Sequence, residues 1–262
     1  MPDIWGAAEA YEYLMGRWSR SLGPRFLEWA RIPADGEVLD VGCGTGSLSE
    51  ALLGRGRASV VGVDPSPAYV GFATSRLSRN GNVSFRVGDA MALPFPDGRF
   101  PAVVSSLMLN HVPDPARALG EMRRVASDGG VVACCVWDYS GGMEMLRAFW
   151  DAAVSLDPSA AAWDEGPRFT VCRPEGLAEA YRRAGLARVE TAAVEIPMVF
   201  AGFDDYWRPF LGGQGPSSGY AMGLSEGDRE ALRRLLESRL RPRGDGAIAL
   251  TGRAWAARGI KE

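Results

Sequence analysis

EVLDVGCGTG, residues 37 to 46, decides the fold of this chain, because an apolar run ends here in three glycines at alternate positions. The residues that follow, SLSEALL at 47 to 53, start a helix. Glycines let a backbone approach a ligand closely, and the N-terminus of a helix presents unpaired amide groups. The stretch therefore predicts a buried strand, a ligand-binding turn and a helix in succession.

Short apolar runs alternate with helical patterns from residue 37 onward. Runs this apolar are typical of strands covered on both faces, as in a parallel sheet between helices. Helix starts are marked by Asp114-Pro115, Pro174 and Ser225, and we expect the first of these helices to stop at Gly129-Gly130. The pattern predicts a doubly wound α/β fold, with strands at 37–42, 58–64, 82–89, 100–108, 129–137, 186–196 and 247–255.

The spacing of glycines and carboxylates indicates which ligand the turn binds. Dinucleotide enzymes use G-x-G-x-x-G, which would require glycine at position 47, but this chain has Ser47. Carboxylates end three consecutive predicted strands, at Asp40, Asp64 and Asp89. Asp64 stands where a side chain can accept hydrogen bonds from both ribose hydroxyls. Three acceptors along one crevice suit a cationic nucleoside better than a pyrophosphate, which favours a sulfonium cofactor.

Four motifs carry a resemblance to a known family. They read DVGCGTGSLSEAL, VVGVDPS, FRVGDAMALPFPDGRF and SSLMLNHVPDPARALGEMRRV, and they stand in this order between residues 37 and 137. The set resembles the successive motifs of the class I S-adenosylmethionine-dependent methyltransferases, in the broad group that includes quinone- and sterol-methylating enzymes. The resemblance implies a Rossmann-like sheet of seven strands, mostly parallel with an antiparallel last strand. It also implies S-adenosylmethionine as cofactor, S-adenosylhomocysteine as product, and no metal.

The resemblance assigns the methionine part of the cofactor to the glycine turn. The backbone of Gly42, Cys43 and Gly44 would contact it, and Asp40 would position either this loop or the cofactor's amino group. At the end of the fourth strand, Ser106-Leu107 would flank the sulfonium.

The resemblance assigns the nucleoside part to the next two strand ends. Asp64 would hold the ribose hydroxyls and Pro65 would pack on the adenine. Asp89 would accept a hydrogen bond from the adenine amino group, with Ala90 and Met91 alongside.

An N-terminal helix often closes over the site in this family. Arg17 is the candidate partner of the cofactor carboxylate, and the alternative is a packing helix with an exposed arginine. The candidates in the stretch YEYLMGRWSR are Tyr11, Met15, Arg17 and Trp18.

Two departures from the family pattern stand out. The family commonly has Phe-Asp at the start of the fourth strand, where this chain has Phe100-Pro101. Proline is tolerated at the start of a strand, so we expect the strand to form without the acid. The stretch LMLNHVPD differs from that of the quinone-methylating members, which argues against a quinone acceptor.

The 262 residues correspond in length to a single methyltransferase domain. We expect residues 1–36 to form a helical lid, 37–137 the cofactor-binding core, and 173–196 and 225–262 the rest of the sheet with its helices. Segments 138–172 and 197–224 are rich in aromatic residues, Gly and Pro. We expect them to cap the strand ends, where ligands bind, the alternative being surface loops that core aromatics anchor.

Charge and the scarcity of two residue types exclude several functions. The net charge of −3 gives no positive field to attract nucleic acid. Lys261 is the only lysine, which excludes Schiff-base chemistry and a GxxxxGK loop. The four cysteines form no CxxC pair and are expected to be reduced and packed.

The start MPDIWGAAEA is unlike a signal peptide, and the longest apolar run, residues 129–137, is far shorter than a membrane span. We expect a cytoplasmic protein without a membrane partner.

Two motifs suggest other chemistry. GPSSG, residues 215–219, matches the GxSxG elbow by letter, but no strand precedes it and no histidine follows it, so a serine hydrolase is rejected. His111 is the only histidine and follows the fourth predicted strand, where it could accept a proton from an acceptor molecule. The alternative is that His111 only caps the helix that begins near Asp114.

The sequence as a whole predicts an S-adenosylmethionine-dependent methyltransferase that acts on a small-molecule acceptor by in-line displacement. The aromatic segments and the lack of basic surface favour a small acceptor. A methyltransferase for protein or nucleic acid, and a cofactor-binding protein without transfer activity, remain as alternatives.

Overall fold

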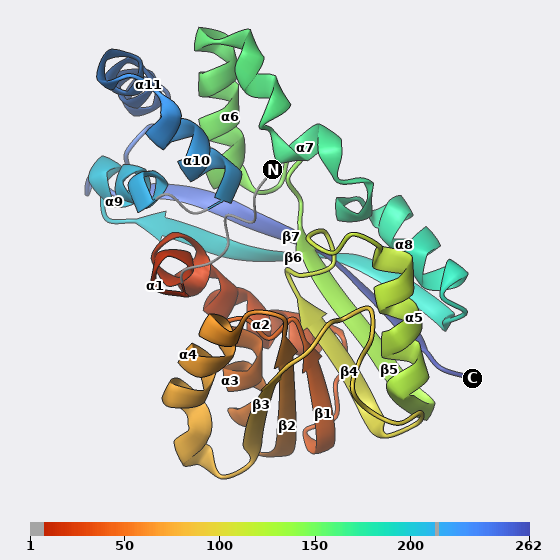
Figure 1. Ribbon diagram of the computed structural model, residues 1–262. Helices are drawn as coiled ribbons and strands as arrows, with labels where there is room; N and C mark the ends of the chain where they lie inside the picture. Colours follow the sequence, from red (N-terminus) through yellow and green to blue (C-terminus); the bar gives the residue numbers. More distant parts are fainter. Residues whose placement is uncertain (1–7, 213–214) are drawn as a thin grey trace. The chain divides into compact units, whose positions relative to one another are not determined.

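Among the residues that the computed structural model describes, 8–212 and 215–262, seven strands form one sheet in the order β3-β2-β1-β4-β5-β7-β6 (Figure 1). Neighbours from β3 to β5 are parallel, and β7 is antiparallel to β5, with Val131 opposite Ile260. The predicted seven-stranded α/β sheet is confirmed. The strands are β1 (Asp35–Val41), β2 (Arg57–Asp64), β3 (Val83–Val87), β4 (Phe100–Ser106), β5 (Ala126–Trp137), β6 (Ala187–Phe200) and β7 (Ile248–Ile260).

Helices fill most of the remaining described chain. The α-helices are α1 (Ala8–Tyr11), α2 (Arg17–Trp29), α3 (Ser47–Leu53), α4 (Pro67–Leu77), α5 (Pro115–Val125), α6 (Glu144–Leu156), α7 (Glu165–Arg168), α8 (Pro174–Arg183), α9 (Phe203–Trp207), α10 (Gly215–Gly223) and α11 (Glu226–Arg239). Residues Glu12–Gly16 (η1) form a π-helical turn, and the 3₁₀ turns are η2 (Ser78–Asn80), η3 (Pro158–Ala162), η4 (Thr170–Cys172) and η5 (Arg208–Gly212).

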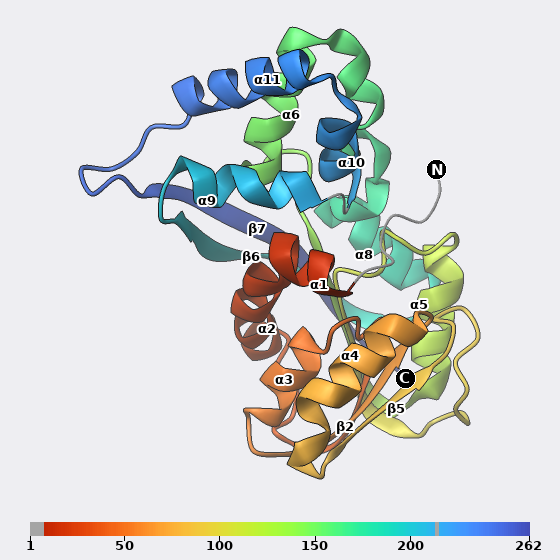
Figure 2. The same cartoon turned by 60° about the vertical axis from the view of Figure 1, so that its left-hand side comes forward.

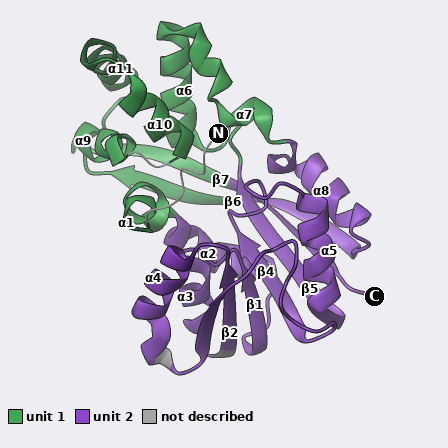
Figure 3. Ribbon diagram, viewed as in Figure 1, with its two compact units in different colours: residues 1–18, 138–169, 195–253 green, residues 19–137, 170–194, 254–262 purple. Residues whose placement is uncertain are grey.

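The chain divides into two compact units, which Figure 3 shows in separate colours. Unit 1 consists of residues 1–18, 138–169 and 195–253, and unit 2 of residues 19–137, 170–194 and 254–262. Unit 2 holds the glycine turn and the strand ends that the sequence singles out.

The five parallel strands of unit 2, β1 to β5, have helices on both faces. Figure 2 shows α3 and α4 on one side of β1 to β5 and α5 on the other. The central strands of this unit are apolar and buried along most of their length, as expected for strands covered on both faces: Val38 and Leu39 of β1 are fully buried, as are Val103 and Val104 of β4. The predicted helix starts are confirmed, since α3 begins at Ser47, α5 at Pro115 and α8 at Pro174.

Several element boundaries differ from the prediction. Helix α5 ends at Val125 and not at Gly129-Gly130, because residues 126–130 already belong to β5. There the Gly129 amide donates to the carbonyl of Lys261, and the Lys261 amide donates to the carbonyl of Gly130. Pairing with the distant end of the chain therefore overrides the local stop signal. Strand β6 similarly continues past residue 196 to Phe200.

Pro101 lies where β4 tolerates it. The register between β4 and β5 shifts between Phe100 and Ala102, so the proline stands at a bulge where its missing N–H interrupts no ladder. The strand continues to Ser106, which confirms that Phe100-Pro101 does not prevent its formation.

Unit 1 contains the aromatic side chains of both predicted cap segments, and most of them are buried against one another. Phe149 stacks on Phe210 with ring centroids 4.5 Å apart and meets Trp150 edge to face at 5.0 Å. Tyr206 is also fully buried. These contacts give unit 1 its own core, as in the alternative interpretation of the aromatics, and the role of the segments as a cap stays a prediction. Within the described part of the chain, no helix has both the length and the apolar character needed to cross a membrane.

Candidate functional site

In the glycine turn after β1, other atoms leave the backbone of Gly44 uncovered. Gly42 and Gly44 have φ angles of 70° and 51°, a region that favours glycine. A side chain at Gly42 would collide with Met108, whereas no atom lies within 4 Å of the position that a Cβ of Gly44 would occupy. The turn is anchored to β2, since the amides of Gly42 and Cys43 donate to the carbonyl of Val63 at 2.7 and 3.0 Å. The backbone at Gly44 is therefore rigidly presented and accessible to a ligand.

Asp64, the last residue of β2, joins this turn to the next strand. Its Oδ2 accepts a hydrogen bond of 3.0 Å from the Gly44 amide, and its Oδ1 accepts one of 2.9 Å from the Ser66 amide. The side chain is 7% exposed. Each carboxylate oxygen can accept more than one hydrogen bond, so these amides fix the carboxylate without exhausting it as an acceptor.

Asp40 faces the protein interior. It is fully buried, and its Oδ2 accepts a hydrogen bond of 2.7 Å from the hydroxyl of Ser49 in α3. The pKa of Asp40 is raised to about 7, mainly by burial; the bond from Ser49 opposes this rise and the nearby charge of Asp64 adds to it. Whether Asp40 positions the loop or contacts a cofactor amino group stays open as a prediction.

Asp89 follows β3, the strand next to β2. Its side chain is exposed, and its Oδ1 accepts a hydrogen bond of 2.8 Å from the Met91 amide. The Gly88 amide donates to the carbonyl of Asp64 at 3.1 Å, which ties the two strand ends together. Ala90 is buried, and Pro65 is exposed beside Asp64. Asp64 thus ends β2, as predicted, while Asp89 lies two residues after the end of the adjacent β3.

The chain makes a strained turn after β4. Leu107 has a φ angle of 62°, which is uncommon for a residue with a side chain, and its amide donates to the carbonyl of Cys135 at 2.8 Å. The hydroxyl of Ser106 lies 3.4 Å from the Cys135 sulfur. The turn brings Met108 against Gly42. Sequence reasoning passed over Met108, because a methionine in the apolar run LMLN gives no sign of packing on a distant glycine.

His111 is exposed and does not cap α5. Asp114 does so, since its Oδ1 accepts a hydrogen bond of 3.0 Å from the Arg117 amide. Instead, Nε2 of His111 lies 3.2 Å from Nδ2 of the buried Asn110. The capping alternative for His111 is therefore removed, and its role as a base stays a prediction.

The N-terminal candidates lie in residues 1–18 and belong to unit 1. Met15 and Trp18 are 5% exposed. Arg17 forms an ion pair of 3.0 Å with Asp205, and its guanidinium lies over the rings of Trp18 and Phe200, at 4.2 and 4.8 Å. These contacts are those of a packing helix, and the predicted role of Tyr11, Met15 and Arg17 toward a cofactor stays a prediction.

Burial keeps three thiols of unit 2 protonated at neutral pH. Burial raises the pKa of Cys134 and of Cys135 to about 12, and the pKa of Cys43 is raised as well. All four cysteines are buried and none forms a disulfide, as expected. In residues 8–212 and 215–262, no group of three or more His, Cys, Asp and Glu side chains could hold a metal ion.

The donors and acceptors of the turn fit a nucleoside that carries a positive charge. Gly44 offers an accessible backbone, Asp64 a fixed carboxylate and Asp89 an exposed one. Negative carboxylates would repel a pyrophosphate and attract a cation, in agreement with the sequence.

Comparisons with known proteins show similarity to methyltransferases. Residues 39–134 match the family model of a methyltransferase domain. The chain is 35% identical to the demethylmenaquinone methyltransferase of Thermobifida fusca over 160 residues, which are 60% of this chain and 67% of that protein. It is 34% identical over 186 residues to the 2-methyl-6-phytyl-1,4-hydroquinone methyltransferase of Synechocystis, which covers 70% of this chain and 57% of that protein. The chain spans about half the length of several curated relatives that it matches.

Solved structures share the fold at low sequence identity. YcgJ of Bacillus subtilis has a TM-score of 0.56 at 22% identity, with 94% of this chain and 99% of that chain covered. Phosphoethanolamine N-methyltransferase 2 of Haemonchus contortus, solved in complex with S-adenosyl-L-methionine, has a TM-score of 0.59 at 17% identity, with 97% of this chain and 56% of that chain covered.

Proposed function

This chain belongs to the class I S-adenosylmethionine-dependent methyltransferases, and we propose that it transfers a methyl group from S-adenosylmethionine to a small-molecule acceptor. The observation that carries the proposal is the hydrogen bond from the Gly44 amide to Asp64, beside the open face of Gly44. It supports a cofactor whose methionine part contacts the turn while its ribose hydroxyls donate to Asp64.

The nucleoside contacts proposed here follow the strand ends. Asp64 binds the ribose hydroxyls and Pro65 packs on the adenine. Asp89 accepts from the adenine amino group, with Ala90 and Met91 beside it. The exposure of Asp89 and the amide bonds that orient Asp64 support these roles.

The remaining contacts proposed here concern the reacting end of the cofactor. The backbone of Gly42, Cys43 and Gly44 contacts the methionine part, and Asp40 supports the turn through Ser49. Ser106-Leu107 flanks the sulfonium. The N-terminal contacts would come from Tyr11, Met15 and Arg17.

The protein's share in catalysis is alignment. When bound, S-adenosylmethionine supplies an activated methyl group, so the residues have to orient the acceptor and exclude water. His111 would accept the acceptor's proton at Nε2 or Nδ1 if the nucleophile carries one.

We propose a quinone-type acceptor, that is, an aromatic ring on an apolar tail. Relatives named for a phytyl hydroquinone and for demethylmenaquinone support this class. It reverses the expectation from LMLNHVPD, since the relatives include quinone methyltransferases in spite of that difference. Cytoplasmic location and the absence of a nucleic-acid partner stay predictions.

Two experiments test the proposal. In calorimetry, we expect the protein to bind S-adenosylmethionine and S-adenosylhomocysteine but not NAD. In turnover assays with labelled cofactor, we expect methylation of demethylated hydroquinones rather than of protein or RNA. Tight NAD binding without binding of either sulfur nucleoside would exclude the assignment.

A further inference from the structure

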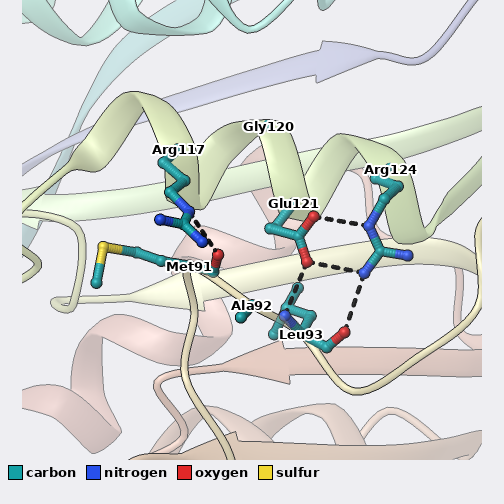
Figure 4. A pocket seen from close by; sticks show the side chains of 7 residues that line it. All are labelled: Met91, Ala92, Leu93, Arg117, Gly120, Glu121 and Arg124. Atoms are coloured by element: carbon teal, nitrogen blue, oxygen red, sulfur yellow. Dashed lines mark hydrogen bonds and ion pairs between the residues drawn. The ribbon is translucent and has the colours of Figure 1, made fainter.

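One face of α5 is bonded to the loop that follows Asp89. Arg124 has an acceptor for all five of its N–H donors: both carboxylate oxygens of Glu121, the carbonyls of Leu93 and Phe95, and Oδ1 of Asp97. Figure 4 shows its bonds to Glu121 and Leu93. Donor to acceptor distances are 2.7 to 2.9 Å. The guanidinium is therefore committed to the loop and to its neighbour on the helix.

Two further side chains on this face bind the same loop. Glu121 accepts a hydrogen bond of 2.8 Å from the Leu93 amide, and Nε of Arg117 donates one of 2.9 Å to the carbonyl of Met91. Residues 117, 121 and 124 are four and three positions apart, so they lie along one face of α5. The bonds from Arg124 lower the pKa of Glu121, which keeps that carboxyl ionised at neutral pH. The side chains of Arg117, Glu121 and Arg124 border a groove of about 520 Å³ between α5 and the loop.

These bonds hold a stretch of chain that has no regular secondary structure. Residues 93–99 belong to no helix or strand, so few backbone ladder bonds hold them. Met91 to Phe95 instead receive a side-chain bond at alternate residues, from Arg117, Glu121 and Arg124. Because this stretch directly follows Asp89, its position also sets the backbone of Asp89 to Met91.

We propose that Arg117, Glu121 and Arg124 are positioning residues that hold the loop after β3 in the shape that binds the adenine end of the cofactor. The inference rests on the proposed function, but it concerns residues outside the cofactor contacts. A loop that is correctly shaped only part of the time binds its ligand more weakly in proportion to that fraction. Once the cofactor is bound, the loop is in place, so the chemical step should be unaffected.

The test compares Arg124→Gln and Arg117→Gln with Arg123→Gln. Arg123 is the matched control, because it lies on the same helix but donates to the carbonyl of Gly185 at 3.0 Å. Two quantities are measured for each protein: hydrogen exchange of the amides of residues 88–98, and the dissociation constant for S-adenosylhomocysteine by calorimetry. KM for S-adenosylmethionine and kcat are added once an acceptor is known.

For Arg124→Gln we expect faster exchange in residues 88–98 and a dissociation constant raised about tenfold, with kcat unchanged at saturating cofactor. Arg117→Gln should show a smaller effect in the same direction. Because Arg117 is exposed, we expect this variant to fold. Arg124→Lys should not restore binding. The single ammonium group of lysine cannot reach the five acceptors that surround the planar guanidinium of arginine. Arg123→Gln should match the wild type.

The inference is overturned if the wild type binds S-adenosylhomocysteine and both Arg117→Gln and Arg124→Gln bind it equally well. It is also overturned if exchange in residues 88–98 is unchanged in folded Arg124→Gln. If the wild type itself does not bind, the proposed function fails, while the exchange data still report whether α5 holds the loop.

Discussion

The amide of Gly44 donates a hydrogen bond of 3.0 Å to Oδ2 of Asp64, which joins the turn after β1 to the end of β2. One carboxylate thus orients the glycine turn and stands at its open face. The bond makes loop geometry and ligand binding depend on the same side chain.

Replacing Asp64 should weaken both binding and folding. Hydrogen bonds to a charged group contribute about 1.5 to 3 kcal/mol, so we expect Asp64→Asn to weaken S-adenosylhomocysteine binding by roughly 10- to 150-fold. Asparagine keeps the shape of the side chain but has one acceptor oxygen for the two amides of Gly44 and Ser66, so one of these bonds is lost and the melting temperature should fall as well. Calorimetry and thermal unfolding check both points, and an unchanged dissociation constant in the folded variant would show that Asp64 does not bind the ribose.

The two glycines of the turn should respond differently to alanine. Both have positive φ, so each substitution costs about 1 to 2 kcal/mol in backbone strain. At Gly42 the new methyl group also collides with Met108, whereas at Gly44 it meets open space. We expect Gly42→Ala to lower the free energy of unfolding more than Gly44→Ala does. For Gly44→Ala we expect a greater loss of cofactor affinity for each kcal/mol of stability lost.

Met108→Ala provides the control for this comparison. If the collision causes the larger loss, the pair Gly42→Ala with Met108→Ala should be less destabilised than the sum of the single variants. Additive losses in denaturant unfolding would contradict the contact as the cause.

Asp40 should make stability depend on pH. Its pKa rises from 3.8 to about 7 on folding, so between these values the folded protein holds a proton that the unfolded chain has released. The free energy of unfolding should therefore fall as pH rises through this window, by about 3 kcal/mol between pH 5 and 8, and level off above it.

Urea unfolding of Asp40→Asn at both pH values isolates this contribution. The variant should lose less stability than the wild type on going from pH 5 to 8. Glu165, whose pKa burial also raises to about 7, produces a slope of the same sign, so Glu165→Gln serves as the comparison. An equal loss in wild type and Asp40→Asn would rule out Asp40 as a source.

His111 is tested by turnover. Because Asp114 caps α5, we expect His111→Ala to leave the melting temperature and the cofactor dissociation constant near wild type. If His111 acts as a base, turnover should fall by about 10² or more. His111→Gln, which keeps a polar side chain without a titratable group near pH 7, should show the same loss. Equal turnover in a folded variant would leave alignment as the source of catalysis.

The sequence alone predicted the strand, turn and helix around residues 37–53, the order of the strands along the chain, the helix start at Asp114-Pro115 and the family. These features depend on local signals, since apolar periodicity, glycine and proline act over a few neighbouring residues. The ends of β5 and β6 were harder to place, because pairing with distant residues extends strands beyond their local signals.

Only the tertiary structure decided which side chains meet. It turned Asp40 inward to Ser49, brought Met108 onto Gly42 and bound Arg124 to the loop after β3. Most of these partners are separated by many positions in the chain. A sequence pattern records the type and spacing of residues, but a hydrogen bond or a collision depends on distances of a few tenths of an ångström, which packing of the whole unit sets.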